Sequence, residues 1–167
     1  MFGLFRKRIK LTVDEAAMAL LGLIEGLDDP DADQCLHTLD EAPLDSEMLR
    51  GELTYLRVFS IEYGAWLALK QGTVRESLIT AFRSQLRGAI ERAVPGSTML
   101  QDTKSRLDAY WSAANTPHQK GPAWNVGKVF SQYCGEQHDA MLVLQAGVRF
   151  TGTVKAVSEF VRSMRIT

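Results

Sequence analysis

Apolar residues recur at helical spacing through most of this 167-residue chain. The first stripe follows Thr12, and its members lie three or four positions apart, as one face of an α-helix requires. They are Val13, Ala16, Ala17, Leu20, Leu23, Ile24 and Leu27. Comparable stripes occupy residues 46–70, 73–94, 98–115 and 137–164, whereas the two-residue alternation typical of strands is not found. The pattern predicts helix along most of the chain.

Proline and glycine separate the stripes. Pro43, Gly72 and the pair Pro95-Gly96 fall between them, and the segment NTPHQKGP at 115–122 holds two prolines and a glycine. Helices joined by such short connections pack as antiparallel neighbours. With a hydrophobic content of 46%, the chain can bury a core of its own. We therefore predict an all-α fold, a single-domain bundle of about six helices over residues 11–167, preceded by a basic arm over residues 1–10.

The segment 46–70 is apolar around its whole circumference. Its main stripe includes Leu49, Leu56 and Tyr63, while Phe59 and Trp66 lie outside that stripe. A helix of this kind is usually contacted from several sides. We expect it to be the central helix of the bundle.

Three segments have the Thr-x-x-Glu/Gln spacing of a capping box. In that motif the threonine hydroxyl accepts from a backbone amide at the helix start, and the side chain three residues later binds back. The pairs are Thr12 with Glu15, Thr73 with Glu76, and Thr98 with Gln101. Each predicts a helix start.

Charge is distributed unevenly along the chain, although the net charge is only −1. Residues 1–10 carry four bases, residues 11–52 carry twelve acids and one base, and residues 53–167 carry fourteen bases and eight acids. Opposite charges of this kind favour docking of the acidic N-terminal part on the basic remainder. An acidic face offered to a partner is the alternative.

Two cysteines, Cys35 and Cys134, stand far apart and in no CxxC pattern. That usage is typical of a reducing compartment, so we expect a cytoplasmic protein of bacterial type. The arm MFGLFRKRIK could touch an anionic membrane, but three apolar residues are few for stable anchoring. Membrane contact is therefore the less favoured alternative.

The connection around residues 115–127 is the favoured place for a ligand or partner. It is longer than most connections, and long ordered loops are often functional. Aromatic and cationic side chains gather in and before it: Tyr110, Trp111, His118, Lys120 and Trp124. They could form the mouth of a pocket or bind an acidic partner, or Trp124 could simply anchor the loop.

Metal ligands are weakly indicated. Cys134 and His138 are four apart with Asp139 adjacent, the spacing of two ligands on one helix face, but Gly135 lies between them. The segment DPDADQCLHTLD at 29–40 has acids at some calcium-loop positions, yet Gln34 stands where such a loop needs glycine. Helix-starting acids explain it better. We favour no metal and no cofactor.

The sequence holds no nucleophile elbow, Walker loop or dinucleotide fingerprint. A sequence pI near 6.3 and scattered arginines, of which Arg87 can pair with Glu91, disfavour nucleic acid. We therefore expect a soluble, non-enzymatic protein that contacts another protein, as a regulator, adaptor or immunity-like module. The first alternative is a helical pocket protein for a small ligand or metal. Oligomeric state is left open.

Overall fold

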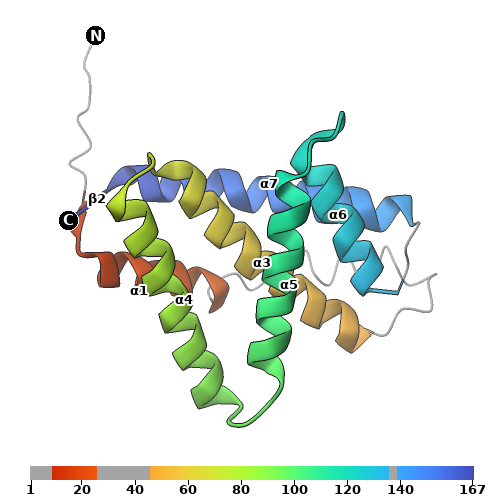
Figure 1. Cartoon of the computed structure of the whole chain (residues 1–167), viewed down its shortest axis with the longest axis horizontal. Coiled ribbons are helices and arrows are strands. Elements are labelled where there is room, and N and C mark those ends of the chain that lie inside the picture. Colours follow the sequence, from red (N-terminus) through yellow and green to blue (C-terminus); the bar gives the residue numbers. More distant parts are fainter. Residues whose placement is uncertain (1–8, 26–45, 136–138) are drawn as a thin grey trace.

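The computed structural model describes residues 9–25, 46–135 and 139–167 of the chain. These residues form six α-helices, so the all-α bundle is confirmed (Figure 1). The helices are α1 (Val13–Glu25), α3 (Ser46–Ala68), α4 (Thr73–Ala93), α5 (Met99–Asn115), α6 (Gly121–Tyr133) and α7 (Ala140–Ser163). No helix of the described part is long and apolar enough to cross a bilayer.

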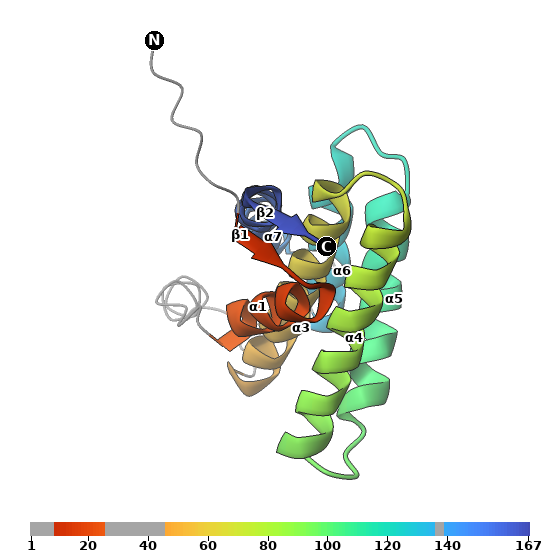
Figure 2. The ribbon, with the colours of Figure 1, turned by 90° about the vertical axis from the view of Figure 1, so that its left-hand side faces the viewer.

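Helix α3 is central, as its apolar circumference predicts. It packs most extensively on α7 and also contacts α1, α4, α5 and α6. Helix α4 follows it after a short turn and runs back in the opposite direction (Figure 1). Helices α4 and α5 form a hairpin on one side of the molecule, with α7 on the other side (Figure 2).

Glycines allow the closest helix contacts. A Cβ on Gly127 of α6 would lie 2.2 Å from the carbonyl oxygen of Val143 of α7. A Cβ on Gly147 of α7 would in turn lie 3.0 Å from the carbonyl oxygen of Ala123 of α6. The α6–α7 contact is therefore one of backbone against backbone, which any larger residue would push apart.

Two short strands join the beginning and the end of the described chain. Strand β1 (Ile9–Leu11) pairs in parallel with β2 (Met164–Ile166), with Lys10 opposite Arg165. The amide of Thr167 donates to the carbonyl oxygen of Leu11 at 3.0 Å. The sequence did not predict these strands, because three residues are too few to show an alternating pattern. Ile9 and Lys10 of the predicted arm belong to β1, and residues 1–8 lie outside the described residues.

The core is one continuous cluster with members from all six described helices. Phe59 of α3 lies at its centre, stacked on Tyr110 of α5 and on Phe150 of α7 with ring centroids 5.3 and 5.6 Å away. Aromatic pairs at these distances add to the energy of burial. Phe59 lies outside the main apolar stripe of α3 and is nevertheless as buried as Leu49 and Leu56 within it.

Of the three predicted capping boxes, one forms. The Glu15 carboxylate accepts from the Thr12 amide at 2.7 Å, and the Thr12 hydroxyl accepts from the Glu15 amide at 3.2 Å. Helix α4 instead begins after Gly72, and helix α5 begins after Thr98, in both cases without a side-chain cap. The other two boxes are therefore wrong, although the helix starts they predicted are correct.

Candidate functional site

The five side chains predicted around residues 110–124 occupy two separate places. Tyr110 has no exposed surface and packs in the core, while the indole Nε1 of Trp111 donates to Glu62 of α3. These two aromatic residues therefore hold α5 against α3. Neither is among the residues that line the groove described below.

The other three side chains lie at the α5–α6 turn. The ammonium of Lys120 sits 3.8 Å from the ring centroid of Trp124, and Nδ1 of exposed His118 accepts from the Lys120 amide at 3.0 Å. Buried Asn125 donates to the carbonyl oxygens of Ala113 and Thr116, which ties the turn to both helices. The turn is well held by its own contacts, and a partner for it stays a prediction.

The structure describes two of the three weak metal candidates, Cys134 and Asp139. Cys134 is buried, and desolvation by burial raises its pKa to about 12. Asp139 caps α7, where its Oδ1 accepts from the amides of Met141 and Leu142 at 2.8 and 3.1 Å. His138 and the calcium-like segment 29–40 lie outside the described residues. Among the residues that are described, no three His, Cys, Asp or Glu side chains gather as a metal site would require.

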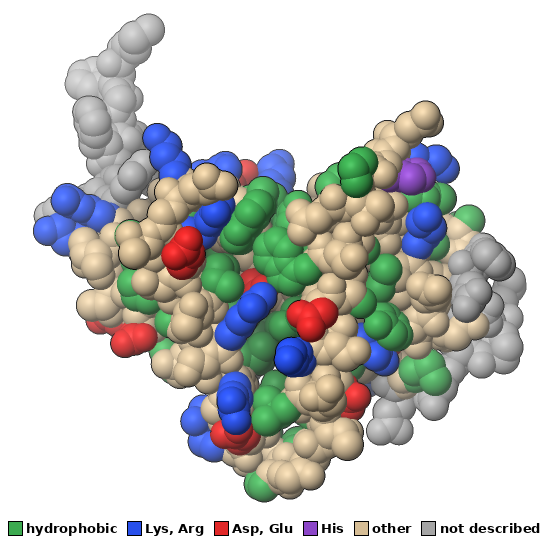
Figure 3. Space-filling view, viewed as in Figure 1, with side chains coloured by type: hydrophobic (Ala, Val, Ile, Leu, Met, Phe, Trp, Pro, Cys, Tyr) green, Lys and Arg blue, Asp and Glu red, His purple; other side chains and the backbone are tan. Residues whose placement is uncertain are grey.

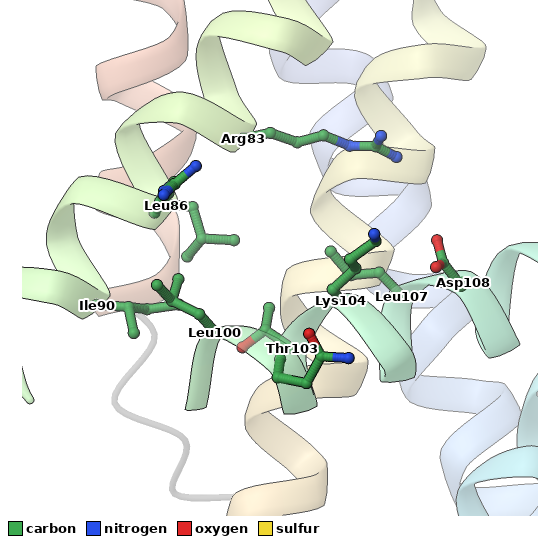
Figure 4. Close-up of a pocket in the computed structure, with 10 residues that line it drawn as sticks. Arg83, Leu86, Ile90, Leu100, Thr103, Lys104, Leu107 and Asp108 are labelled. Carbon is green, nitrogen blue, oxygen red and sulfur yellow. The ribbon is translucent and has the colours of Figure 1, made fainter. Parts of the chain in front are cut away.

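A groove of about 400 Å³ lies between α4 and α5 (Figure 4). Its floor is apolar, with Leu86 and Ile90 from α4 and Leu100 and Leu107 from α5. Leu86, Ile90 and Leu107 keep only 7–8% of their surface exposed. Hydrophobic side chains gather in this hollow in the space-filling view, with charged side chains along its edges (Figure 3).

The edges of the groove carry three cations and one acid. Arg83 and Arg87 come from α4, and Lys104 and Asp108 come from α5. Nε of Arg87 donates to Glu91 at 2.9 Å, which confirms the pairing predicted from their spacing. Lys104 is exposed and has no ion-pair partner among the described residues. Lys104 is therefore the rim cation that the described residues leave without an ion pair.

Arg83 is the most firmly oriented of the three cations. It extends from α4 towards α3 (Figure 4). There its Nε and Nη2 donate to the two carboxylate oxygens of Glu62 at 2.9 and 2.6 Å. Glu62 has no exposed surface, whereas the Arg83 side chain is 52% exposed. The hydrogen bonds with Glu62 raise the pKa of Arg83, although partial burial opposes this. A guanidinium has five N–H donors, so Arg83 keeps some of them for a group in the groove.

A second buried carboxylate holds α5 in place. Nε of Arg106 donates to both oxygens of Glu52 on α3 at 2.8 and 3.0 Å. The Arg106 guanidinium also lies 3.7 Å from the ring centroid of Tyr133 on α6. Each wall of the groove is thus fixed to α3 by an arginine–glutamate pair, α4 by Arg83 and α5 by Arg106. The groove is therefore largely formed before anything binds.

Sequence reasoning did not predict this groove. Its walls come from two helices, and only their packing angle decides whether the apolar stripes meet or leave a gap. The sequence offered one indication of it. Leu86 and Ile90 are four residues apart on one helix, and so are Arg83 and Arg87, which places an apolar and a basic strip side by side. Comparison with protein-family models, curated proteins and solved structures finds no match for this chain.

Proposed function

We propose that this protein works without catalysis, by binding a partner protein in the α4–α5 groove. The partner segment is an amphipathic helix that carries apolar side chains on one face and carboxylates beside them. A regulator, an adaptor or an immunity-like module would each act in this way. The observation that carries the proposal is an apolar floor flanked by cations, one of which a buried carboxylate holds in place.

The floor suits a helical segment. Leu86 and Ile90 are one turn apart on α4, and Leu100 and Leu107 are two turns apart on α5. Side chains at i, i+4 and i+7 of a third helix fit a floor with this spacing, which is the usual mode of helix-in-groove recognition. A volume of about 400 Å³ accepts a few such side chains and no larger body.

The rim selects for carboxylates. Arg83 keeps N–H donors beyond those it gives to Glu62, and Lys104 has no ion-pair partner among the described residues, so both can pair with an incoming acid. Charges at the edge of an interface mainly set the association rate and the choice of partner. We therefore expect binding to weaken as salt is raised.

The proposal is tested by photo-crosslinking in the source cells. A benzophenone amino acid replaces Arg87 or Lys104 in turn, and Lys128, which is exposed on α6, serves as the matched control position. We expect both groove positions, and not position 128, to crosslink a segment with apolar side chains at helical spacing and acids beside them. Crosslinks of the same partner at all three positions would contradict a specific groove.

The identified segment is then made as a labelled peptide. Fluorescence anisotropy should show its affinity fall about tenfold for Lys104→Glu and for Arg87→Glu, because each change places like charges together. Lys128→Glu should leave it unchanged. An affinity that both groove variants retain would overturn the proposal. Saturable binding of dodecanoate in the groove, with no peptide bound, would favour the small-ligand alternative instead.

A further inference from the structure

One face of α7 is apolar and exposed. Met141, Leu144 and Val148 keep 53%, 53% and 72% of their surface exposed. They are three and four residues apart, so they lie on the same face of the helix. The opposite face, with buried Leu142 and Phe150, packs into the core. Large apolar side chains that cluster in this way, rather than singly, mark an interaction surface.

The same face continues towards the C-terminus without large side chains. Thr151 and Gly152 occupy the next turn, and a Cβ on Gly152 would meet no atom within 4 Å. Lys155 follows one turn later and is exposed, with no ion-pair partner among the described residues. The face therefore carries large apolar side chains towards the N-terminus of α7 and a shallow depression at Gly152 towards its C-terminus.

We infer that this face binds the same face of a second copy, with the two α7 helices antiparallel about a two-fold axis at Val148. In that register Val148 meets Val148 of the partner subunit. Leu144 of each copy lies at the partner's Gly152, where the missing side chain leaves room. Met141 lies beneath the aliphatic stem of the partner's Lys155, which can keep its ammonium in water. An isologous contact of this kind uses one self-complementary patch twice.

Charge favours the antiparallel arrangement over a parallel one. A parallel pair would place Lys155, Glu159 and Arg162, all exposed on α7, each beside the same residue of the partner subunit. The antiparallel pair separates these like charges and brings Lys155 towards the end of the partner's α7 that begins with half-buried Asp139. Like charges placed together at an interface are destabilising. Charge therefore favours the same antiparallel direction as the fit of Leu144 at the partner's Gly152.

The contact is small. Three apolar side chains per copy bury far less than the roughly 800 Å² per partner of a standard stable interface. The dimer should therefore be weak and dependent on protein concentration. The inference does not rest on the groove, because α7 and the α4–α5 hairpin lie on different sides of the molecule (Figure 2).

Disulfide trapping tests the two-fold axis. In the full chain with Cys35→Ser, Val148→Cys should form a covalent dimer under mild oxidation at about 100 μM protein, since the two thiols meet at the axis. Val94→Cys, at a valine outside α7 that is 44% exposed against 72% for Val148, is the control. Cys134 can stay, because it is buried and its raised pKa, about 12, leaves almost no thiolate.

Mixed crosslinking tests the direction. A tagged Leu144→Cys chain mixed with an untagged Gly152→Cys chain should form a mixed disulfide, whereas a parallel pair would crosslink Leu144→Cys with itself. Sedimentation velocity at rising concentration should show a dimer for the unmodified chain and only monomer for Leu144→Glu with an unchanged circular dichroism spectrum. A chain that stays monomeric up to 1 mM, or Val148→Cys that crosslinks no faster than Val94→Cys, would overturn the inference.

Discussion

Glu62 is a carboxylate without exposed surface, and donors from two other helices satisfy it. Arg83 of α4 supplies two N–H groups and Trp111 of α5 supplies one. A buried charge with such partners is strongly destabilising if one partner is removed, although the intact pair adds little net stability. Its role here is one of position, because it fixes which side chains of α4 and α5 meet α3.

We predict that Arg83→Met lowers the free energy of unfolding by about 3 kcal/mol, because Glu62 would stay buried with its charge uncompensated. The matched change Arg87→Met removes an exposed i,i+4 pair and should cost only about 0.5 kcal/mol. Urea unfolding followed by circular dichroism measures both. Equal, small losses would show that water reaches Glu62.

Tyr110, unlike Glu62, carries a buried polar group, its hydroxyl, without a hydrogen-bond partner among the described residues. Burial is the main reason why the pKa of Tyr110 lies well above its ordinary value. The hydroxyl therefore carries a desolvation cost that no hydrogen bond from the described residues offsets.

Tyr110→Phe should accordingly leave stability unchanged or raise it by about 1 kcal/mol, since the ring contacts with Phe59 remain. The midpoint of thermal unfolding is a sufficient measurement. A loss of about 2 kcal/mol or more would show that the hydroxyl has a bound partner in solution.

At the scale of the single element, helix α1 depends on the capping box at its start. Hydrogen bonds from the Thr12 amide, and then from the Thr12 hydroxyl, lower the pKa of Glu15 below its ordinary value of 4.5. The folded state therefore favours the charged carboxylate. The contribution of the box is complete above pH 4.5 and disappears as the pH falls through the lowered folded-state pKa.

An NMR titration of the Glu15 carboxyl should give a pKa below 4.5 in the unmodified chain, and a higher value in Thr12→Val, which keeps only one of the two donors. Amide exchange at the start of α1 should quicken in acid over the same range. If Thr12→Val titrates like the unmodified chain, the hydroxyl has no part in the cap.

The contact between α6 and α7 depends on glycine. Gly127→Ala would place a methyl group 2.2 Å from a backbone oxygen that cannot rotate away, so we expect a loss of about 2–3 kcal/mol as the helices move apart. Gly51→Ala in α3 meets no atom within 4 Å and should gain about 0.5–1 kcal/mol from helix propensity. Chemical denaturation compares the two. A harmless Gly127→Ala would mean that the contact is looser than described.

At the scale of the whole molecule, one core joins all the described helices. Because buried residues of α1 and α3–α7 belong to one cluster, no helix pair has a core of its own. A structure of this kind unfolds as a unit.

Calorimetry should therefore show a single transition whose van't Hoff and calorimetric enthalpies agree. An earlier, separate transition of the α4–α5 hairpin would contradict this, and would place the proposed binding site on a part that folds independently.

Sequence reasoning came closest where the physics is local. The apolar stripe predicted over residues 137–164, which includes Val143, Phe150, Val157 and Val161, forms the buried face of α7, because a helix repeats every 3.6 residues whatever surrounds it. The circumference of α3 likewise predicted its central place. Sequence reasoning grouped Tyr110 and Trp111 with the loop that follows them, because residues close along the chain were assumed to be close in space.

The sequence by itself determined the helices, the points where proline and glycine end them, and the all-α class, because backbone hydrogen bonds within a helix and the local period of apolar residues need no partner element. Only the tertiary structure decided that Glu62 and Glu52 receive their arginines, that Gly127 and Gly147 lie in one contact, and that α4 and α5 leave a groove. Those features depend on the angles and distances between helices, and these follow from packing of the whole core at once.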